Sequence, residues 1–253
     1  MYADARAGRL GAMEAIARGI PAELTIFVKK TYSLLAFSLV LAAAACWVTI
    51  EMMPTATVRL RNGSIGTVSA FPQWGLWLLW GGTFVFSIIG NRAKNGARQG
   101  DVSVMGLVGL VGMVLCAGAM LGPTLGSFVG LGMTDVVLAA AVTTAVTFSA
   151  LTAYIFVTGK NFSFMGGFLG IAFLAFFVAW LVGAFLIRSP EFQWWLAAAG
   201  ALLMSGMILF HTSSVVHYYG PNNLVVPAVI ALFIDIFNLF VMLLRLFAGR
   251  RSN

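Results

Sequence analysis

Charged residues are scarce in this chain of 253 residues, since Asp, Glu, Lys and Arg together make up only 9% of it. A water-soluble globular domain carries roughly 25% charged residues, because most of its surface faces water. Hydrophobic residues make up 60% of the chain. The scarcity of charge excludes a substantial soluble domain and predicts that lipid surrounds most of the protein.

Cysteine and histidine are equally scarce, with two of each. Cys46 and Cys116 lie far apart in separate apolar stretches without a CxxC motif, so we expect buried thiols rather than a disulfide or metal site. The P-loop, HExxH and GxSxG motifs are missing, and an intramembrane zinc hydrolase would need more His and Asp ligands. The sequence therefore predicts no enzyme and no cofactor.

The basic residues are scattered over short loops, as expected for cations that flank membrane spans, and they predict no nucleic-acid partner. Residues 1–30 lack the continuous apolar core of a cleavable signal peptide and are predicted to be a cytoplasmic N-terminal segment. A transmembrane domain is expected over residues 31–247, followed by a short polar tail, 248–253.

Long apolar runs are what the chain has in abundance, and each is about as long as one membrane crossing requires. The fold class predicted from them is an all-α membrane protein with a bundle of seven transmembrane helices. The expected spans are residues 31–53, 73–90, 102–122, 134–157, 163–187, 191–217 and 224–247.

The distribution of Lys and Arg predicts the orientation, because cytoplasmic loops are enriched in both. With the N-terminus cytoplasmic, nine cations fall inside and three outside. The cations of the C-terminal tail fall outside in a seven-span arrangement and oppose the rule. Six spans with a re-entrant last segment would move them inside, but the last run is long enough to cross. Short loops favour a bacterial inner membrane, with the lipid bilayer as the first partner.

Glycines recur every fourth position at Gly118, Gly122, Gly126 and Gly130. Small residues with this spacing allow close helix packing in a membrane. Pro123 is expected to end the third span and to interrupt the series.

Two ionisable residues lie deep inside predicted spans, where a charge is costly. His211 is twelve residues before Asn223, in the turn between the last two spans, and Asp235 is twelve residues after it. At 1.5 Å per residue, both lie roughly 18 Å from the turn and share one level of the membrane. Such a pair could share a proton and act as a gate or pH sensor. The alternatives are that Asp235 only hydrogen-bonds to a neighbouring helix and that His211 is a satisfied core histidine.

Four further residues are candidates for an ion path or a latch on the carboxylate. Glu51 and Arg59 lie near the outer end of the first span, Arg92 ends the second span, and Asn238 follows Asp235 by three positions. For the arginines, the alternative is that the side chains reach up to lipid headgroups.

Two stretches have a distinctive pattern: residues 143–154, TTAVTFSALTAY, and residues 158–169, TGKNFSFMGGFL. They resemble the fourth span and the following loop of the Bax inhibitor-1 family. Residues 27–35 are similar to the first-span pattern of the family, and 231–245 to its last span.

The resemblance implies a seven-helix fold with the last helix central, and a pH-sensitive calcium leak controlled by an aspartate pair. Asp235 matches the last-span aspartate and is the candidate calcium ligand. His211 stands where the family has the other aspartate, and this removes one of the hard oxygen atoms that calcium prefers.

Two functions follow as hypotheses. The first is a pH-responsive ion leak channel, with calcium as a candidate permeant ion, gated around Asp235 and His211. The second is a non-transporting regulator that binds membrane proteins, because some bacterial relatives resemble modulators of a membrane-bound AAA protease.

Overall fold

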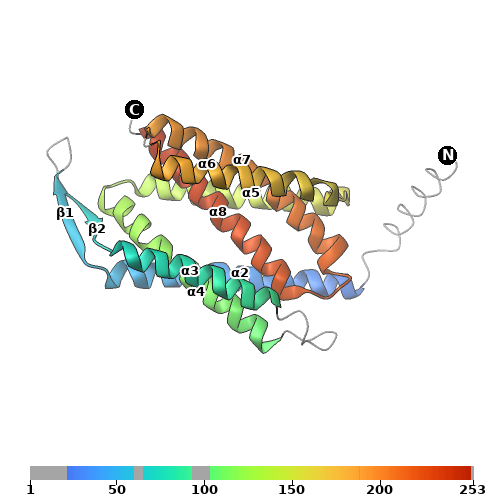
Figure 1. Ribbon diagram of the computed structural model, residues 1–253. Coiled ribbons are helices and arrows are strands. Elements are labelled where there is room, and N and C mark those ends of the chain that lie inside the picture. The colour runs from blue at the N-terminus through green and yellow to red at the C-terminus, as the bar shows by residue number, and fades with distance from the viewer. Residues whose placement is uncertain (1–21, 60–64, 93–102, 188, 252–253) are drawn as a thin grey trace.

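The computed structural model describes residues 22–59, 65–92, 103–187 and 189–251. Most of the predicted N-terminal segment, residues 1–21, therefore lies outside the described residues. The described chain forms a long helical bundle with one small β-hairpin (Figure 1). Its long helices are α2 (Ala22–Met52), α3 (Gln73–Arg92), α4 (Val104–Gly130), α5 (Thr134–Thr158), α6 (Gly166–Phe185), α7 (Pro190–Ser214) and α8 (Val225–Arg251).

Six of these helices are long and apolar enough to cross a membrane: α2, α4, α5, α6 with the short helix η2 (Ser163–Met165) before it, α7 with the π-helical turn η3 (Val215–Tyr219), and α8. The expected class of all-α membrane protein therefore holds for the bundle. The remaining helix, α3, carries Trp74, Trp77 and Trp80 in its first half.

Helix α8 lies at the centre of the bundle. It runs obliquely between a group formed by α2, α3 and α4 and a group formed by α5, α6 and α7 (Figure 1). It packs against α2, α3, α4, α5 and α7. Its first half joins the core with α2 and α4, and its second half joins the core with α5 and α7. In the most apolar stretch of α8, 67% of the residues are buried, compared with 6% in that of η2 and α6.

Several element ends differ from the sequence-based expectation. Helix α2 begins at Ala22 rather than at residue 31, so that Lys29 and Lys30 lie within it. Both lysines are exposed, and their long aliphatic stems allow the charged ends to reach water from a helical position. Helix α8 likewise continues to Arg251, into the predicted polar tail.

Pro123 does not end the third span, contrary to the prediction, because α4 continues through it to Gly130. Helices in membranes tolerate proline where neighbouring groups satisfy the freed backbone atoms. Pro123 frees the carbonyl of Ala119, four residues earlier, and the Ser127 hydroxyl donates one turn later, to the carbonyl of Pro123 itself, at 2.8 Å. The glycine series is consequently continuous: Gly118 and Gly122 face α2, and a Cβ on Gly130 would lie 2.2 Å from the Thr67 carbonyl oxygen.

The β-hairpin lies between the first two expected spans and was not predicted from the sequence. Strands β1 (Thr55–Arg59) and β2 (Ile65–Ser69) pair antiparallel, with Thr57 opposite Thr67. Alternating Thr, Val and Ile residues favour such strands. The backbone N–H of Ser69 donates to the Ser127 hydroxyl at 3.0 Å, which attaches the hairpin to the end of α4.

Candidate functional site

His211 and Asp235 are in direct contact. The Nδ1 atom of His211 on α7 lies 2.6 Å from the Oδ2 atom of Asp235 on α8. The Asp235 side chain is only 2% exposed and the His211 side chain 16% exposed. The equal spacing of the two residues from the turn therefore does place them at one level, as expected for two antiparallel helices with the same rise per residue.

The two helix faces explain why the side chains meet. Ile208 and Thr212, on either side of His211 in α7, are fully buried, as is Leu239, one turn after Asp235 in α8. Residues three and four positions apart share a helix face, so the packed face of each helix carries its polar residue into the interface. A polar interhelical contact satisfies groups that lipid cannot satisfy.

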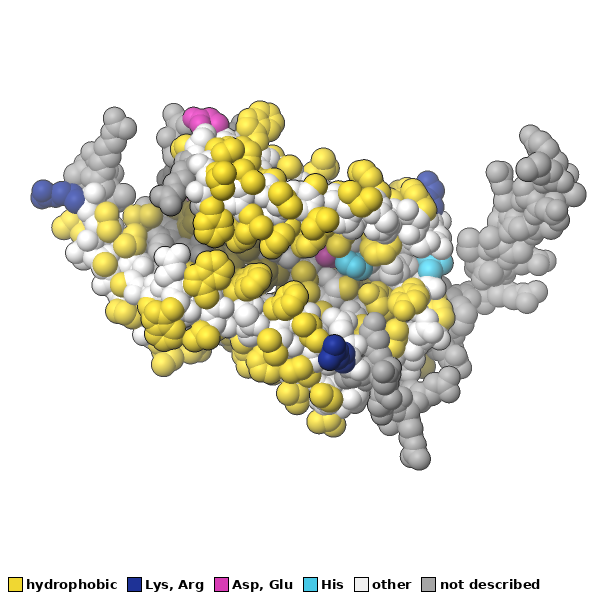
Figure 2. All heavy atoms as spheres, viewed as in Figure 1, with side chains coloured by type: hydrophobic (Ala, Val, Ile, Leu, Met, Phe, Trp, Pro, Cys, Tyr) yellow, Lys and Arg dark blue, Asp and Glu magenta, His cyan; other side chains and the backbone are white. Residues whose placement is uncertain are grey.

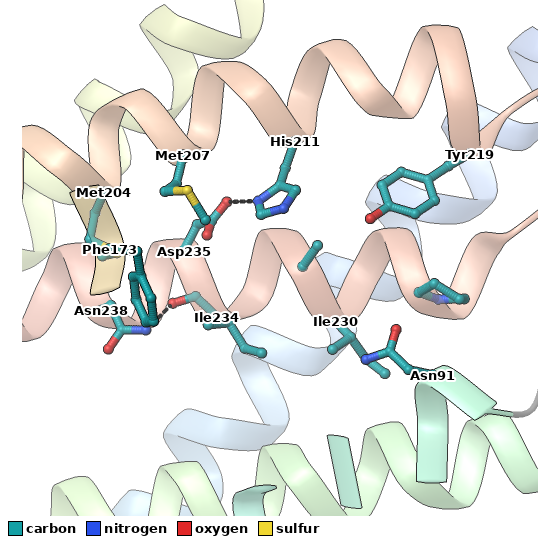
Figure 3. A pocket seen from close by; sticks show the side chains of 12 residues that line it. Asn91, Phe173, Met204, Met207, His211, Tyr219, Ile230, Ile234, Asp235 and Asn238 are labelled. Atoms are coloured by element: carbon teal, nitrogen blue, oxygen red, sulfur yellow. Dashed lines mark hydrogen bonds and ion pairs between the residues drawn. The ribbon is translucent and has the colours of Figure 1, made fainter. Parts of the chain in front are cut away.

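A pocket of about 290 Å³ opens beside this pair. It lies between α3 on one side and α6 and α7 on the other, with α8 as its floor (Figure 3). It is lined by Asn91, Phe173, Met204, Met207, His211, Tyr219, Pro227, Ile230, Ala231, Ile234, Asp235 and Asn238. The pair therefore has access to a space that an ion, water or ligand could occupy.

Of the four further candidates, only Asn238 lines this pocket. Its amide nitrogen donates to the Ile234 carbonyl at 2.9 Å. Glu51 is exposed near the end of α2, and Arg59 is exposed on the β-hairpin at the far end of the bundle. Arg92 is exposed at the end of α3, directly after Asn91. The structure therefore does not bring Glu51, Arg59 or Arg92 to the pair.

Sequence reasoning missed Asn91 and Tyr219, the other polar residues of the pocket. Asn91 is half-buried in the last turn of α3, and its side chain reaches the pocket because α3 packs closely on α8. A Cβ on Gly90 would lie 2.5 Å from the Ile230 side chain, so the absence of a side chain there allows this approach. The sequence signal available was a glycine beside a polar residue at a span end, which is too common to single out a site.

The pair has two protonation states that differ in charge. With the imidazole protonated, it is a neutral ion pair held by a charge-assisted hydrogen bond. With the imidazole neutral, the Nδ1–H donates to the carboxylate and the pair carries one negative charge. A change between these states alters the field in the adjoining pocket. Among the described residues, no three His, Cys, Asp or Glu side chains gather as a metal site would require.

Comparisons with known proteins agree with the resemblance of the motifs. The family model described as "Inhibitor of apoptosis-promoting Bax1" matches residues 24–252. The chain is 30% identical over 191 residues to "Modulator of FtsH protease YccA" of Escherichia coli K12, which covers 75% of this chain and 83% of that protein. It is 30% identical over 226 residues to the protein PA2604 of Pseudomonas aeruginosa, covering 89% and 90% of the two chains.

A eukaryotic relative extends the same comparison. "Bax inhibitor 1" of Schizosaccharomyces pombe is 30% identical over 135 residues, which is 53% of this chain and 50% of that protein. The family model covers the bundle from the start of α2 to the end of α8. The chain therefore belongs to the Bax inhibitor-1 family.

Proposed function

We propose that this protein is a pH-responsive ion leak channel of a bacterial inner membrane, gated at His211 and Asp235. The observation that carries the proposal is the 2.6 Å contact between the two side chains, beside a pocket within the bundle. Holding a carboxylate inside a membrane protein is costly, and such residues mark ion and proton pathways. The inner-membrane location is supported by "Inner membrane protein YccA" of E. coli O6:H1, 30% identical over 191 residues.

The proposed channel has seven spans, with α3 as the span added to the six apolar helices. Helix α3 has 20 residues, and at about 1.5 Å per residue it extends roughly 30 Å, the thickness of the hydrocarbon core. Its tryptophans are exposed and would face the headgroup region, where Trp is enriched. With the N-terminus cytoplasmic, the C-terminal end of α8 then lies outside.

The gate is the hydrogen-bonded pair that joins α7 to α8. Protonation of the Asp235 carboxyl beside a protonated imidazole would weaken this contact and free the two helices to separate at the pocket. Hydrogen ions, potassium and calcium are the candidate permeant ions. Calcium prefers oxygen ligands, and the imidazole of His211 supplies none.

The test is ion flux into proteoliposomes across pH 5–8, measured separately for calcium, potassium and hydrogen ions. Asp235→Asn should flatten the pH dependence, because the amide cannot titrate. Ser38→Ala is the matched control: Ser38 is another buried polar residue of a span, bonded to the Leu34 carbonyl at 2.8 Å and outside the pocket. A pH profile that Asp235→Asn leaves unchanged would contradict the proposal.

A second function, regulation of an FtsH-type membrane-bound protease, is favoured by a specific comparison. The aligned region covers 83% of "Modulator of FtsH protease YccA", so the likeness extends over most of that protein. On this proposal the protein acts through contacts with membrane proteins, and residues 1–24 form the contact with the protease.

This second proposal predicts an effect in E. coli cells that lack YccA. The full chain should change the half-life of a membrane substrate of FtsH, and deletion of residues 1–24 should abolish that change. The same deletion should leave ion flux intact if the channel proposal is right. An unchanged half-life with the full chain at normal abundance would count against the regulator.

A further inference from the structure

Two side-chain amides, from different helices, line the pocket. The Asn91 amide nitrogen donates to the Ser87 carbonyl at 3.0 Å, and the Asn238 amide nitrogen donates to Ile234 at 2.9 Å. Because each amide uses one N–H in this way, its second N–H and its side-chain oxygen remain for a ligand. The pocket thus presents amide N–H groups and oxygens from two different helices, α3 and α8.

The carboxylate adds charge to this set of polar groups. The imidazole of His211 engages one carboxylate oxygen of Asp235, Oδ2, so the other oxygen is available for a second partner. The Tyr219 hydroxyl lines the same space, and its side chain is oriented along the pocket toward His211 (Figure 3). With the imidazole neutral, the site has one negative charge, and an ammonium group matches it with three donors.

The rest of the lining is apolar and adaptable. Phe173, Met204 and Met207 form the wall opposite α3. A phenyl ring attracts a nearby cation, and methionine side chains adjust to hydrocarbon of irregular shape. The pocket therefore combines a carboxylate with an apolar wall, and one ligand can contact both.

The hollow opens on the side of the bundle, between its ends (Figure 2). Hydrophobic side chains line both rims, and a histidine beside an acidic side chain is visible inside (Figure 2). In a membrane, this side faces the acyl chains rather than water. A volume of about 290 Å³ is at the lower end of small-molecule sites, so it accommodates a head group and the first carbons of a chain.

We propose that this pocket binds a lipophilic organic amine that reaches it from the bilayer. The ammonium group donates to the free oxygen of Asp235, and its hydrocarbon chain leaves through the side opening. The negative charge of Asp235 disfavours a ligand that also carries an anionic group, which distinguishes a free amine from the phosphate-linked amine of phosphatidylethanolamine. The inference does not depend on ion conduction, because the pocket and its acceptors are present whether or not an ion crosses.

The test is binding of radiolabelled dodecylamine to the full chain in phosphatidylcholine nanodiscs. We expect one saturable site from which unlabelled dodecylamine displaces the label, whereas dodecanol and dodecyl sulfate, with the same tail, do not. Displacement by dodecanol would overturn the proposal, because the ammonium group would then contribute nothing. Loss of the site on adding phosphatidylethanolamine would assign it to a lipid headgroup and overturn the free-amine proposal.

Two variants locate the site. Asp235→Asn keeps the side-chain volume and should weaken binding at least tenfold, and Ala231→Phe should abolish binding by filling the pocket while leaving the His211–Asp235 pair. Thr144→Ala is the control, since Thr144 is buried on α5, bonded to the Ala140 carbonyl at 2.7 Å and outside the pocket. Each variant is compared at equal folded concentration by size-exclusion chromatography. Full binding by both pocket variants would overturn the proposal, and ion flux plays no part in the readout.

Discussion

At the scale of single residues, the His211–Asp235 contact satisfies two polar side chains, each of which would be destabilising alone inside the bundle. A buried carboxylate without a partner must either lose its charge or remain unsatisfied in a region of low dielectric. Asp235 is almost completely buried, so loss of the imidazole leaves Oδ2 without its protein partner. The pair therefore contributes to stability as well as to any gating.

We predict that removing one partner costs more than removing both. His211→Leu should lower the free energy of unfolding by about 1–3 kcal/mol, because it leaves the Asp235 carboxyl buried and unpaired. Adding Asp235→Leu should restore part of that loss, since no polar group then remains to be satisfied. Reversible unfolding in SDS, followed by circular dichroism, measures both. Losses that simply add would show that the two side chains are not energetically coupled.

At the scale of elements, the glycines of α4 determine how closely the helices approach. A Cβ on Gly118 would lie 2.3 Å from the Ala42 carbonyl oxygen of α2, and a Cβ on Gly109 would lie 2.3 Å from the Gly90 nitrogen of α3. In lipid, helices associate through such close packing, because burying apolar surface provides no drive when the solvent is also apolar. The Gly109 contact holds α3 against α4 and thereby positions Asn91 at the pocket.

Gly109→Ala should therefore be destabilising, by roughly 1–3 kcal/mol, because the new methyl group meets backbone rather than a flexible side chain. Gly81→Ala on α3 is the matched control, since a Cβ there has nothing within 4 Å. The control should be neutral or stabilising because alanine favours a helix over glycine. Thermal unfolding of the two purified variants in the same detergent tests the difference. Equal unfolding midpoints would mean that the α3–α4 contact accommodates the added methyl group without loss of stability.

At the scale of the whole molecule, the start of α2 and the end of α8 lie at opposite ends of the bundle (Figure 1). An odd number of crossings follows if the long axis of the bundle is the membrane normal. Seven spans satisfy this condition only when α3 crosses together with the six apolar helices. The positive-inside rule then predicts a cytoplasmic N-terminus.

Reporter fusions in a bacterial host test this arrangement. Alkaline phosphatase fused after Asn253 should be active, and green fluorescent protein at the same position should be dark, because both then lie in the periplasm. Green fluorescent protein fused before Met1 should be bright. A fluorescent C-terminal fusion would instead indicate six crossings, with the last segment re-entrant.

The sequence by itself determined the class of the fold and the depth of its ionisable pair. Long apolar runs require a helical bundle in lipid, and a constant rise per residue places His211 and Asp235 at one level because each is twelve residues from Asn223. Only the tertiary structure decided that Asn91 joins them, that Arg59 and Arg92 do not, and that α4 continues past Pro123. Those outcomes depend on which helix faces meet across loops of variable length, and distance along the chain does not specify that choice.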